Sequence, residues 1–247
     1  MLMFCRAPDQ AEYPSGTTNT SVDNALSFLL KTVPDFPELV KNRSVLDFGC
    51  GFGHQATAIA RDYDAEVVGL DLPRPALKEN WDRLLQQYPL PNLKLTTDLP
   101  AEKRFDLVYS CSSFEHFDDP AAILRMMRDR LKPEGKVVIS FAEPWYSNSG
   151  SHMDGFCRLP WVNLLFSERT VMSVRSRYRS DGAVRYEDVE GGLNRMTVAR
   201  FERIIKESGM RIEWFKLWST RGLPAVTEVP VLRELLTSAC SCILSNR

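Results

Sequence analysis

From residue 43 onward, segments with nearly continuous apolar residues alternate with segments in which apolar residues recur every three or four positions. Short, nearly continuous apolar runs are typical of buried strands. They occupy residues 43–48, 65–71, 92–97, 105–112 and 136–142. Between most of them, apolar residues recur three or four positions apart, which is the spacing of a helix with one buried face. Strands that alternate with helices predict a mostly parallel sheet covered on both faces.

The helical spacing predicts helices at 21–33, 54–63, 74–88, 119–135 and 198–208. Ser21 and Thr197 are expected to cap the first and last of these, since hydroxyl oxygens accept from free backbone N–H groups. Gly135 and Gly209 are expected to end the helices before them. A strand at 211–218, a short helix at 229–236 and a strand at 237–245 complete the predicted order.

The alternation stops between residues 143 and 196, where aromatics, glycines and arginines show no clear period. We therefore predict an α/β fold with a doubly wound, mostly parallel seven-stranded sheet and an insertion after the fifth strand. Residues 1–43 are predicted to form an N-terminal arm and lid helix. Residues 44–247 are predicted to form the main domain, with 143–196 as an insertion over the carboxyl edge of the sheet.

Composition narrows the class of protein. The chain has 247 residues, 44% of them apolar, and a net charge of −1, so no overall field favours nucleic acid or membrane. No apolar run is long enough to span a bilayer, and "MLMFC" lacks the basic lead of a signal peptide. The six cysteines show no metal-ligand spacing. They predict reduced thiols, no metal site and a cytoplasmic location.

Three glycines at alternate positions, Gly49, Gly51 and Gly53, follow the first predicted strand and precede the first helix of the sheet. Ligands of open α/β sheets bind at this edge. A phosphate-binding P-loop would end in GK[ST], and a dinucleotide fingerprint would read GxGxxG. Here the spacing is GxGxG and His54 follows. Asp47 adds a negative charge just before the glycines, which favours a ligand that carries positive charge.

The stretch "VLDFGCGFG" resembles the first motif of the class I S-adenosylmethionine-dependent methyltransferases, close to the type 11 and type 12 domains. Later segments resemble the other motifs of that family in the expected order. The resemblance implies that Asp71, in "VVGLDLP", lies at the ribose of the donor with Leu72 next to it in the donor site, and that Asp98 and Leu99, in "TTDLP", lie beside the adenine. Ser110, in "FDLVYSCSSFEHF", is implied near the donor. Asp47 and the glycines would hold its amino-acid tail and ribose.

The resemblance implies an enzyme that uses S-adenosyl-L-methionine, leaves S-adenosyl-L-homocysteine and methylates O or N of a small metabolite, natural product or sugar. Two alternatives stay open. One is a nicotinamide-dependent reductase on a similar sheet, which the glycine spacing disfavours. The other is a methyltransferase-like module that binds the donor without turnover. A nucleic-acid acceptor is disfavoured by the near-neutral charge.

The acceptor is expected to bind at the insertion. His152, in the glycine-rich "SNSGSHMDG", is the first candidate for a general base, and His116 the second. Arg175, Arg177 and Arg179 alternate in "VRSRYRS" and would share one face of a strand. They would either hold an anionic acceptor or form a solvated edge.

Overall fold

The computed structural model describes residues 1–6, 21–153, 155–189, 191–222 and 227–247. These residues form one seven-stranded sheet in the order β3-β2-β1-β4-β5-β7-β6. The strands are β1 (Ser44–Phe48), β2 (Glu66–Leu70), β3 (Leu93–Thr96), β4 (Phe105–Cys111), β5 (Leu131–Ala142), β6 (Arg211–Ser219) and β7 (Thr237–Ser245). The first five strands are parallel, and β7 pairs antiparallel with both β5 and β6. The predicted fold class is confirmed.

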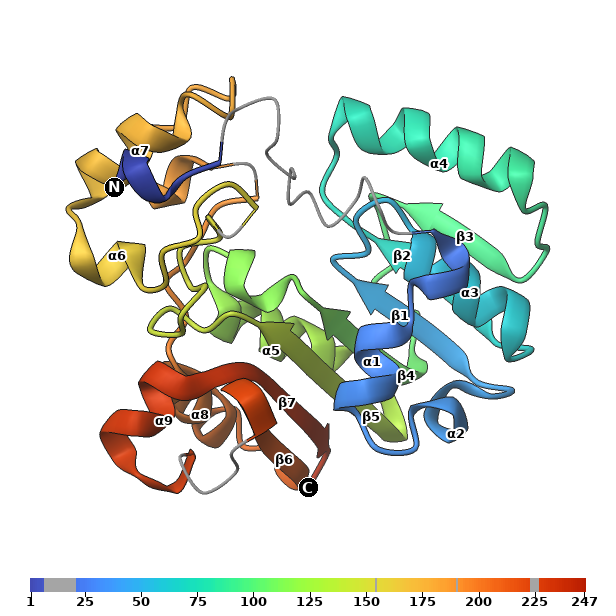
Figure 1. Ribbon diagram of the computed structural model, residues 1–247. Helices are drawn as coiled ribbons and strands as arrows, with labels where there is room; N and C mark the ends of the chain where they lie inside the picture. Colours follow the sequence, from blue (N-terminus) through green and yellow to red (C-terminus); the bar gives the residue numbers. More distant parts are fainter. Residues whose placement is uncertain (7–20, 154, 190, 223–226) are drawn as a thin grey trace.

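Helices cover both faces of the sheet (Figure 1). One face carries α1 (Ser27–Thr32), α2 (Phe36–Val40), α3 (His54–Asp62) and α4 (Pro75–Gln87). The other face carries α5 (Pro120–Asp129) and α8 (Val198–Glu207). The remaining α-helices among the described residues are α6 (Val162–Leu165) and α7 (Glu168–Arg175) in the insertion and α9 (Pro230–Leu236) before β7. Each face has its own apolar cluster, so strands such as β1 are buried on both sides.

The chain order reverses between β1 and β4, which are neighbours in the sheet. From β1 the chain moves outward to β2 and β3, then returns to β4 on the opposite side of β1. The loops after β1 and β4 therefore diverge at one point of the carboxyl edge. Such a switch point is where open α/β sheets bind ligands.

The predicted helix over 119–135 is too long, because the helix ends at Asp129 and β5 begins at Leu131. Gly135 lies within β5 and does not end a helix. A Cβ atom built on Gly135 would lie 2.9 Å from the carbonyl oxygen of Phe105. The strand pairing shifts register at the same place. The glycine therefore allows β5 to approach β4 closely at an irregular step, as glycines inside strands often do.

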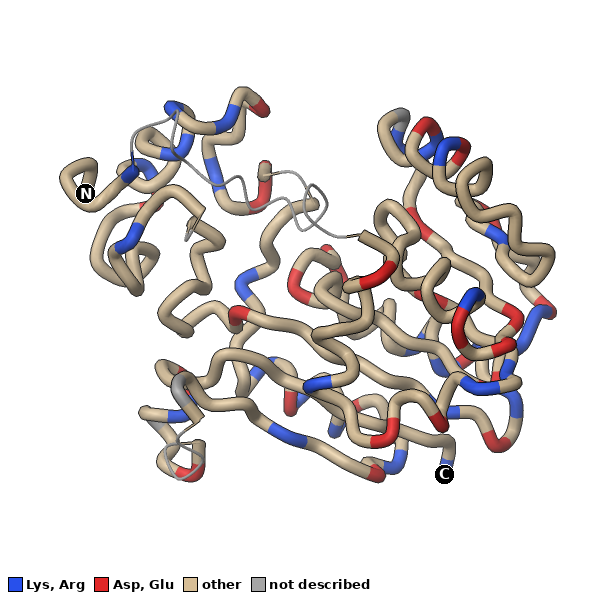
Figure 2. Tube along the Cα trace, turned by 45° about the vertical axis from the view of Figure 1, so that its right-hand side comes forward, with Lys and Arg blue, Asp and Glu red and all other residues tan. Residues whose placement is uncertain are grey.

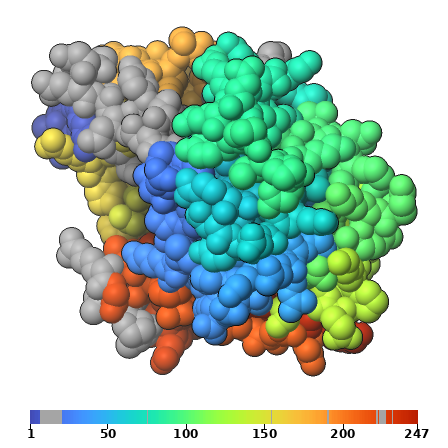
Figure 3. All heavy atoms as spheres, turned by 90° about the vertical axis from the view of Figure 1, so that its right-hand side faces the viewer, coloured from blue at the N-terminus to red at the C-terminus, as the bar shows by residue number. Residues whose placement is uncertain are grey.

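The predicted N-terminal helix is shorter than expected. Residues 22–24 form a 3-10 turn, and the backbone N–H of Ser21 donates to Asn24 Oδ1 at 2.9 Å. The α-helix begins at Ser27, and α2 follows without having been predicted. Figure 3 shows these blue N-terminal residues packed beside the lighter blue residues that follow β1. Residues 7–20 of the predicted arm lie outside the described residues.

The helix and strand after the insertion agree with prediction. The Thr197 hydroxyl accepts from the backbone N–H of Arg200 at 3.1 Å and caps α8. Gly209 follows α8 with φ +72°, a conformation that favours glycine at a helix end. Cys240 and Cys242 on β7 are both fully buried, as expected for core packing.

The insertion is more regular than its sequence predicts. It contains α6 and α7 and an apolar cluster of its own, to which Met1 and Cys5 also contribute. Arg175 ends α7, and Arg177 follows in a turn, so the expected strand with three arginines on one face is wrong. Arg175 is paired with Asp181 through two hydrogen bonds of 2.6 Å. An alternation of only three residues also fits a helix end and a turn, which explains the error.

Acidic and basic residues are interspersed along the trace (Figure 2), in keeping with the net charge of −1. Among the described residues no helix is both long enough and apolar enough to cross a membrane.

Candidate functional site

The glycine loop, residues 47–53, joins β1 to α3 at the switch point. Gly49, Gly51 and Gly53 have φ angles of +83°, +52° and +83°. A Cβ on Gly49 would lie 2.9 Å from the Cβ of Ser113, and one on Gly53 would lie 2.7 Å from a methyl carbon of Leu95. These two glycines allow the loop to pack against the protein. Gly51 differs, because a Cβ there would meet nothing within 4 Å. Its backbone is the part of the loop that a ligand can approach.

Asp71, directly after β2, holds the open part of this loop. Its Oδ2 accepts from the backbone N–H of Gly51 at 2.7 Å. Its Oδ1 accepts from the N–H of Leu72 at 2.8 Å and from the Arg74 guanidinium at 3.0 Å. Helix α4 begins later, at Pro75, with Arg74 as its capping residue. Asp71 therefore does not cap α4, and its carboxylate links the ends of β1 and β2.

Asp47 lies beneath the loop with 1% of its surface exposed. Its Oδ2 has no hydrogen-bond partner among the described residues. Burial, with a smaller contribution from the charge of Asp71, raises the pKa of this carboxyl to about 7, and the Tyr109 hydroxyl opposes part of the rise. A buried carboxylate with an oxygen that lacks a hydrogen-bond partner is costly, so Asp47 makes the loop a favourable place for a cationic group.

Asp47 is expected to make folding stability fall as pH rises. The folded protein keeps the carboxyl protonated up to about pH 7, whereas the unfolded chain loses the proton near 3.8. The folded state therefore binds more protons in this interval, and stability decreases by roughly 3–4 kcal/mol across it. Asp47→Asn should remove this decrease. Urea unfolding at pH 5 and pH 8 measures the part of the decrease that falls between these two pH values, roughly 2.5–3 kcal/mol.

Asp106→Asn is the matched control for this experiment. Hydrogen bonds from Ser44 and Lys132 lower the pKa of Asp106 to about 2 despite partial burial. Its contribution is therefore constant between pH 5 and pH 8, and the variant should lose stability equally at both. An Asp47→Asn protein with the wild-type pH dependence would show that Asp47 is ionised throughout.

The other residues predicted to bind the donor differ in how far their side chains are exposed to solvent. Leu72 is 75% exposed, an unusual position for a large apolar side chain. Asp98 is exposed and Leu99 is half-buried, both after β3. Ser110 is fully buried and its hydroxyl has no partner among the described residues. Leu72 and Asp98 are thus accessible to a ligand, whereas Ser110 is reached only if its neighbours move.

Sequence reasoning missed several residues that shape the loop. The Trp81 indole on α4 donates to the carbonyl of Gly51 at 2.8 Å. The hydroxyl of Ser113 donates to the carbonyl of Gly49 at 2.9 Å. Trp81 has the apolar spacing of an ordinary helix residue, so its role was not visible in the pattern. Ser113 lies two residues beyond β4, in the segment whose sequence pattern points to Ser110 and His116 and not to Ser113.

A second group of polar side chains lies after β4 and β5. We call Glu115, His116, Glu143 and His152 the histidine cluster. The rings of His116 and His152 meet edge to face, with centroids 5.4 Å apart. Glu143 Oε2 lies 3.7 Å from His152 Nε2, and Glu115 Oε1 lies 4.0 Å from His116 Nε2. The structure therefore brings the two predicted histidines together and adds two carboxyl groups.

The two histidines differ in their surroundings. Burial, with a smaller contribution from the charge of His116, lowers the pKa of His152 to about 3. About a quarter of the His152 side chain remains exposed. His152 and Glu143 both have left-handed backbones, with φ of +53° and +59°. Such conformations cost energy in residues other than glycine and are found at functional sites.

His116 is fixed by the segment that leads into α8. Its Nδ1 lies 2.5 Å from the carbonyl oxygen of Gly192, which can only accept, so Nδ1 carries the hydrogen. Asn194 donates from its side-chain amide to the carbonyls of Phe114 and Phe117 at 2.9 and 2.8 Å. The residues around Asn194 thus hold the short turn that carries His116 and set the orientation of its ring.

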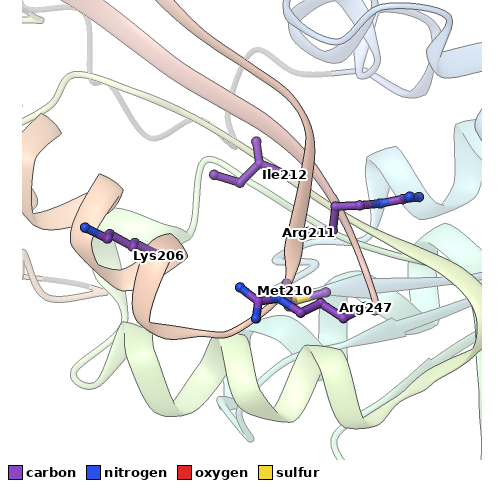
Figure 4. Close-up of a pocket in the computed structure, with 5 residues that line it drawn as sticks. All are labelled: Lys206, Met210, Arg211, Ile212 and Arg247. Carbon is purple, nitrogen blue, oxygen red and sulfur yellow. The ribbon is translucent and has the colours of Figure 1, made fainter.

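A hollow of about 550 Å³ lies elsewhere, between the end of α8 and the start of β6. Figure 4 shows Lys206, Met210, Arg211, Ile212 and Arg247 around it. Since β6 begins and β7 ends there, it is at the amino edge of the sheet, away from the glycine loop. In the described part of the chain, no three or more His, Cys, Asp or Glu side chains are arranged so that they could hold a metal ion.

Residues 22–213 match the family model of a methyltransferase domain. Phosphoethanolamine N-methyltransferase 1 of Triticum aestivum is 34% identical over 113 residues, which are 44% of this chain and 23% of the relative. Ubiquinone biosynthesis O-methyltransferase of Alkalilimnicola ehrlichii is 33% identical over 105 residues, or 41% of this chain and 42% of the relative. The chain thus matches less than half the length of either relative.

A solved structure shares the fold. Magnesium protoporphyrin IX methyltransferase of Synechocystis, crystallised with S-adenosylhomocysteine, superposes with a TM-score of 0.52 and 16% identity. The likeness covers 92% of this chain and 81% of that one.

Proposed function

Because the chain belongs to the class I S-adenosylmethionine-dependent methyltransferases, we propose that it methylates an oxygen or nitrogen of a small acceptor. The observation that carries the proposal is the open backbone of Gly51, held by Asp71 at the switch point. The nicotinamide alternative lacks support, because the matching family model is a methyltransferase domain. The proposal places the donor at the glycine loop and the acceptor at the histidine cluster.

The residues at the loop fit the donor. Gly51 leaves room for a ligand against the backbone, and the carboxylate of Asp71 can accept from ribose hydroxyls. The exposed apolar side chain of Leu72 suits the face of an adenine ring. Asp47 is buried with an oxygen that has no hydrogen-bond partner, so its carboxylate would stabilise the positively charged sulfonium group of the donor. When bound, the donor supplies an activated methyl group, so the protein's tasks are alignment and proton handling.

His152 is proposed to take the proton that a hydroxyl or amine acceptor must lose. Its lowered pKa keeps the ring neutral at pH 7, which is the form that can accept a proton. A base with so low a pKa needs help as charge develops. Glu143, 3.7 Å from Nε2, can stabilise the imidazolium as it forms. His116, fixed by Gly192, limits the orientations of the His152 ring.

The insertion, residues 143–196, is proposed as the acceptor side of the domain 44–247, and residues 1–43 are proposed as an N-terminal arm and lid helix. His152 and the edge-to-face pair of Trp145 and Tyr186 come from this segment, with the two rings 4.8 Å apart. Arg195 lies over both rings and pairs with Glu168. An anionic acceptor therefore has less support than the sequence indicated, since Arg175 and Arg195 both have carboxylate partners.

Labelled methyl transfer tests the acceptor class. The protein is incubated with donor carrying a deuterated methyl group and with a cell extract separated into small molecules, RNA and protein. We expect the label in the small-molecule fraction, on oxygen or nitrogen, and an equal amount of S-adenosylhomocysteine. Label found only in RNA or protein would refute the small-acceptor proposal. Donor binding with no labelled product in any fraction would favour the non-catalytic module.

A further inference from the structure

The first six residues lie along the insertion as a short antiparallel pair. The backbone N–H of Arg6 donates to the carbonyl of Phe156 at 2.8 Å. The N–H of Arg158 donates to the carbonyl of Phe4 at 3.0 Å. Cys5 and Cys157 are the directly opposed residues between these two bonds. Figure 1 shows the N-terminus beside α6 and α7, far in sequence but close in space.

The hydrogen-bond pattern shows which type of antiparallel pair the two cysteines form. Both hydrogen bonds come from the flanking residues and neither from the cysteines themselves. Cys5 and Cys157 are therefore a non-hydrogen-bonded pair, in which opposed Cα atoms are about 4.5 Å apart and side chains are closest. A disulfide needs Cα atoms roughly 4.4–6.8 Å apart. The Cα separation that is typical of this kind of pair therefore lies within the range that a disulfide needs.

We propose that Cys5 and Cys157 form a reversible disulfide that fastens the N-terminal segment to the insertion. Both are free thiols in this structure. With glutathione disulfide as oxidant, the Cys5 thiolate attacks one of its sulfurs and releases one glutathione. The Cys157 thiolate then attacks the Cys5 sulfur of the mixed disulfide and releases the second glutathione. Two protein thiols are oxidised, one disulfide of the oxidant is reduced, and the two protons are taken up by the released thiolates or the buffer.

The surroundings assign different roles to the two sulfurs. Cys157 is 3% exposed, whereas Cys5 is half-buried and within reach of a small oxidant. The Cys5 thiol donates to the carbonyl of Met1 at 3.6 Å. Tyr178 donates to the carbonyl of Arg6 at 2.7 Å and fixes the segment beside the pair. Cys5 is therefore the residue that meets the oxidant, and Cys157 is the one that resolves the mixed disulfide.

The reaction is expected to be slow at neutral pH. Burial, with smaller contributions from the neighbouring Cys157 thiol, raises the pKa of Cys5 to about 11. Since the thiolate is the attacking species, the rate should rise about tenfold per pH unit between pH 7 and pH 9. This dependence distinguishes the pair from an exposed thiol of ordinary pKa, whose rate levels off near pH 8.5.

Peptide mapping tests the disulfide on the whole native protein. Trypsin cuts after Arg6, Lys136 and Arg158, so each cysteine of the pair lies alone in its peptide, 1–6 and 137–158. After treatment with glutathione disulfide and alkylation of free thiols, mass spectrometry should detect these two peptides joined. Dithiothreitol should separate them. Cys5→Ser and Cys157→Ala should each abolish the joined species.

Cys240 and Cys242 serve as the internal control. They face one side of the same strand, two residues apart, where their Cα atoms are about 6.7 Å apart and their side chains are parallel. They should stay reduced under the same treatment. Oxidised wild-type protein should also melt roughly 5–10 °C higher than reduced protein, because the bond closes the long loop from 5 to 157. Neither single variant should show this shift.

Two results would overturn the proposal. One is separate glutathione adducts on Cys5 and Cys157 that never convert to the joined peptides. The other is a pair that remains reduced at pH 9 while glutathione disulfide reacts elsewhere. Both results leave the proposed methyl transfer untouched, since neither concerns the glycine loop or the histidine cluster.

Discussion

Gly51→Val should weaken binding of S-adenosylmethionine and S-adenosylhomocysteine by at least about 100-fold, or roughly 2.7 kcal/mol. Gly51 is the one glycine of the loop whose built Cβ meets nothing within 4 Å. A branched side chain there would fill the space in which the proposed ligand lies against the backbone. Its φ of +52° would add strain of about 1–3 kcal/mol, because β-branched residues avoid this region. Calorimetric titration of the variant measures the effect.

Gly209→Val is the matched control. Gly209 has φ +72°, and a Cβ there also meets nothing within 4 Å. It lies between α8 and β6 at the amino edge, far from the loop. The control should lose a similar amount of stability in thermal melting and keep its donor affinity. Equal donor affinity in wild type and Gly51→Val would remove the loop backbone from the donor site.

His152→Asn should lower kcat by about 100- to 10,000-fold, which is the typical contribution of a general base to the rate. Asparagine tolerates the left-handed backbone of this position, φ +53°, better than alanine does. The variant therefore removes the imidazole with little added strain. Donor affinity should be nearly unchanged, since His152 lies in the insertion. The initial rate of labelled methyl transfer at saturating donor measures kcat.

Asn42→Ala controls for backbone strain in the companion variant His152→Ala. Asn42 has φ +55°, is exposed and precedes β1 at the amino edge. The Asn42→Ala variant should lose stability without losing kcat.

The kcat of the wild-type enzyme should show no decline on the acidic side above about pH 5, because the lowered pKa keeps His152 neutral there. A wild-type kcat in His152→Asn would place the base elsewhere, with Glu143 next to be tested.

The sequence predicted the sheet and the glycine loop well because these depend on local patterns. Apolar runs bounded by turns mark buried strands wherever the sheet has two covered faces. The prediction that Gly135 ends a helix was wrong, because a single glycine is compatible both with a helix end and with a close approach of two strands. The 2.9 Å distance from a Cβ built on Gly135 to the Phe105 carbonyl oxygen, which is known only from the structure, distinguishes the close strand approach from the helix end. Long-range contacts of this kind leave no local signature.

The histidine cluster was predicted only in part for the same reason. His152 and His116 were both singled out, but their ring contact of 5.4 Å joins two segments that are far apart in sequence. Glu143 reaches His152 because the chain turns sharply after β5, with φ +59° at Glu143 itself. Nothing in the residue pattern specifies that turn. The antiparallel pairing of Cys5 with Cys157 was hidden likewise, since the partner of a short isolated strand is set by tertiary packing.

Calorimetric titration of the wild-type protein with three ligands tests most directly the central claim, that the glycine loop and the end of β2 form one methyl-donor site. S-adenosylmethionine and S-adenosylhomocysteine should each bind with one-to-one stoichiometry and compete with each other. NADH should give no binding heat at the same concentrations. Saturable NADH binding together with no binding of either sulfur ligand would contradict the account.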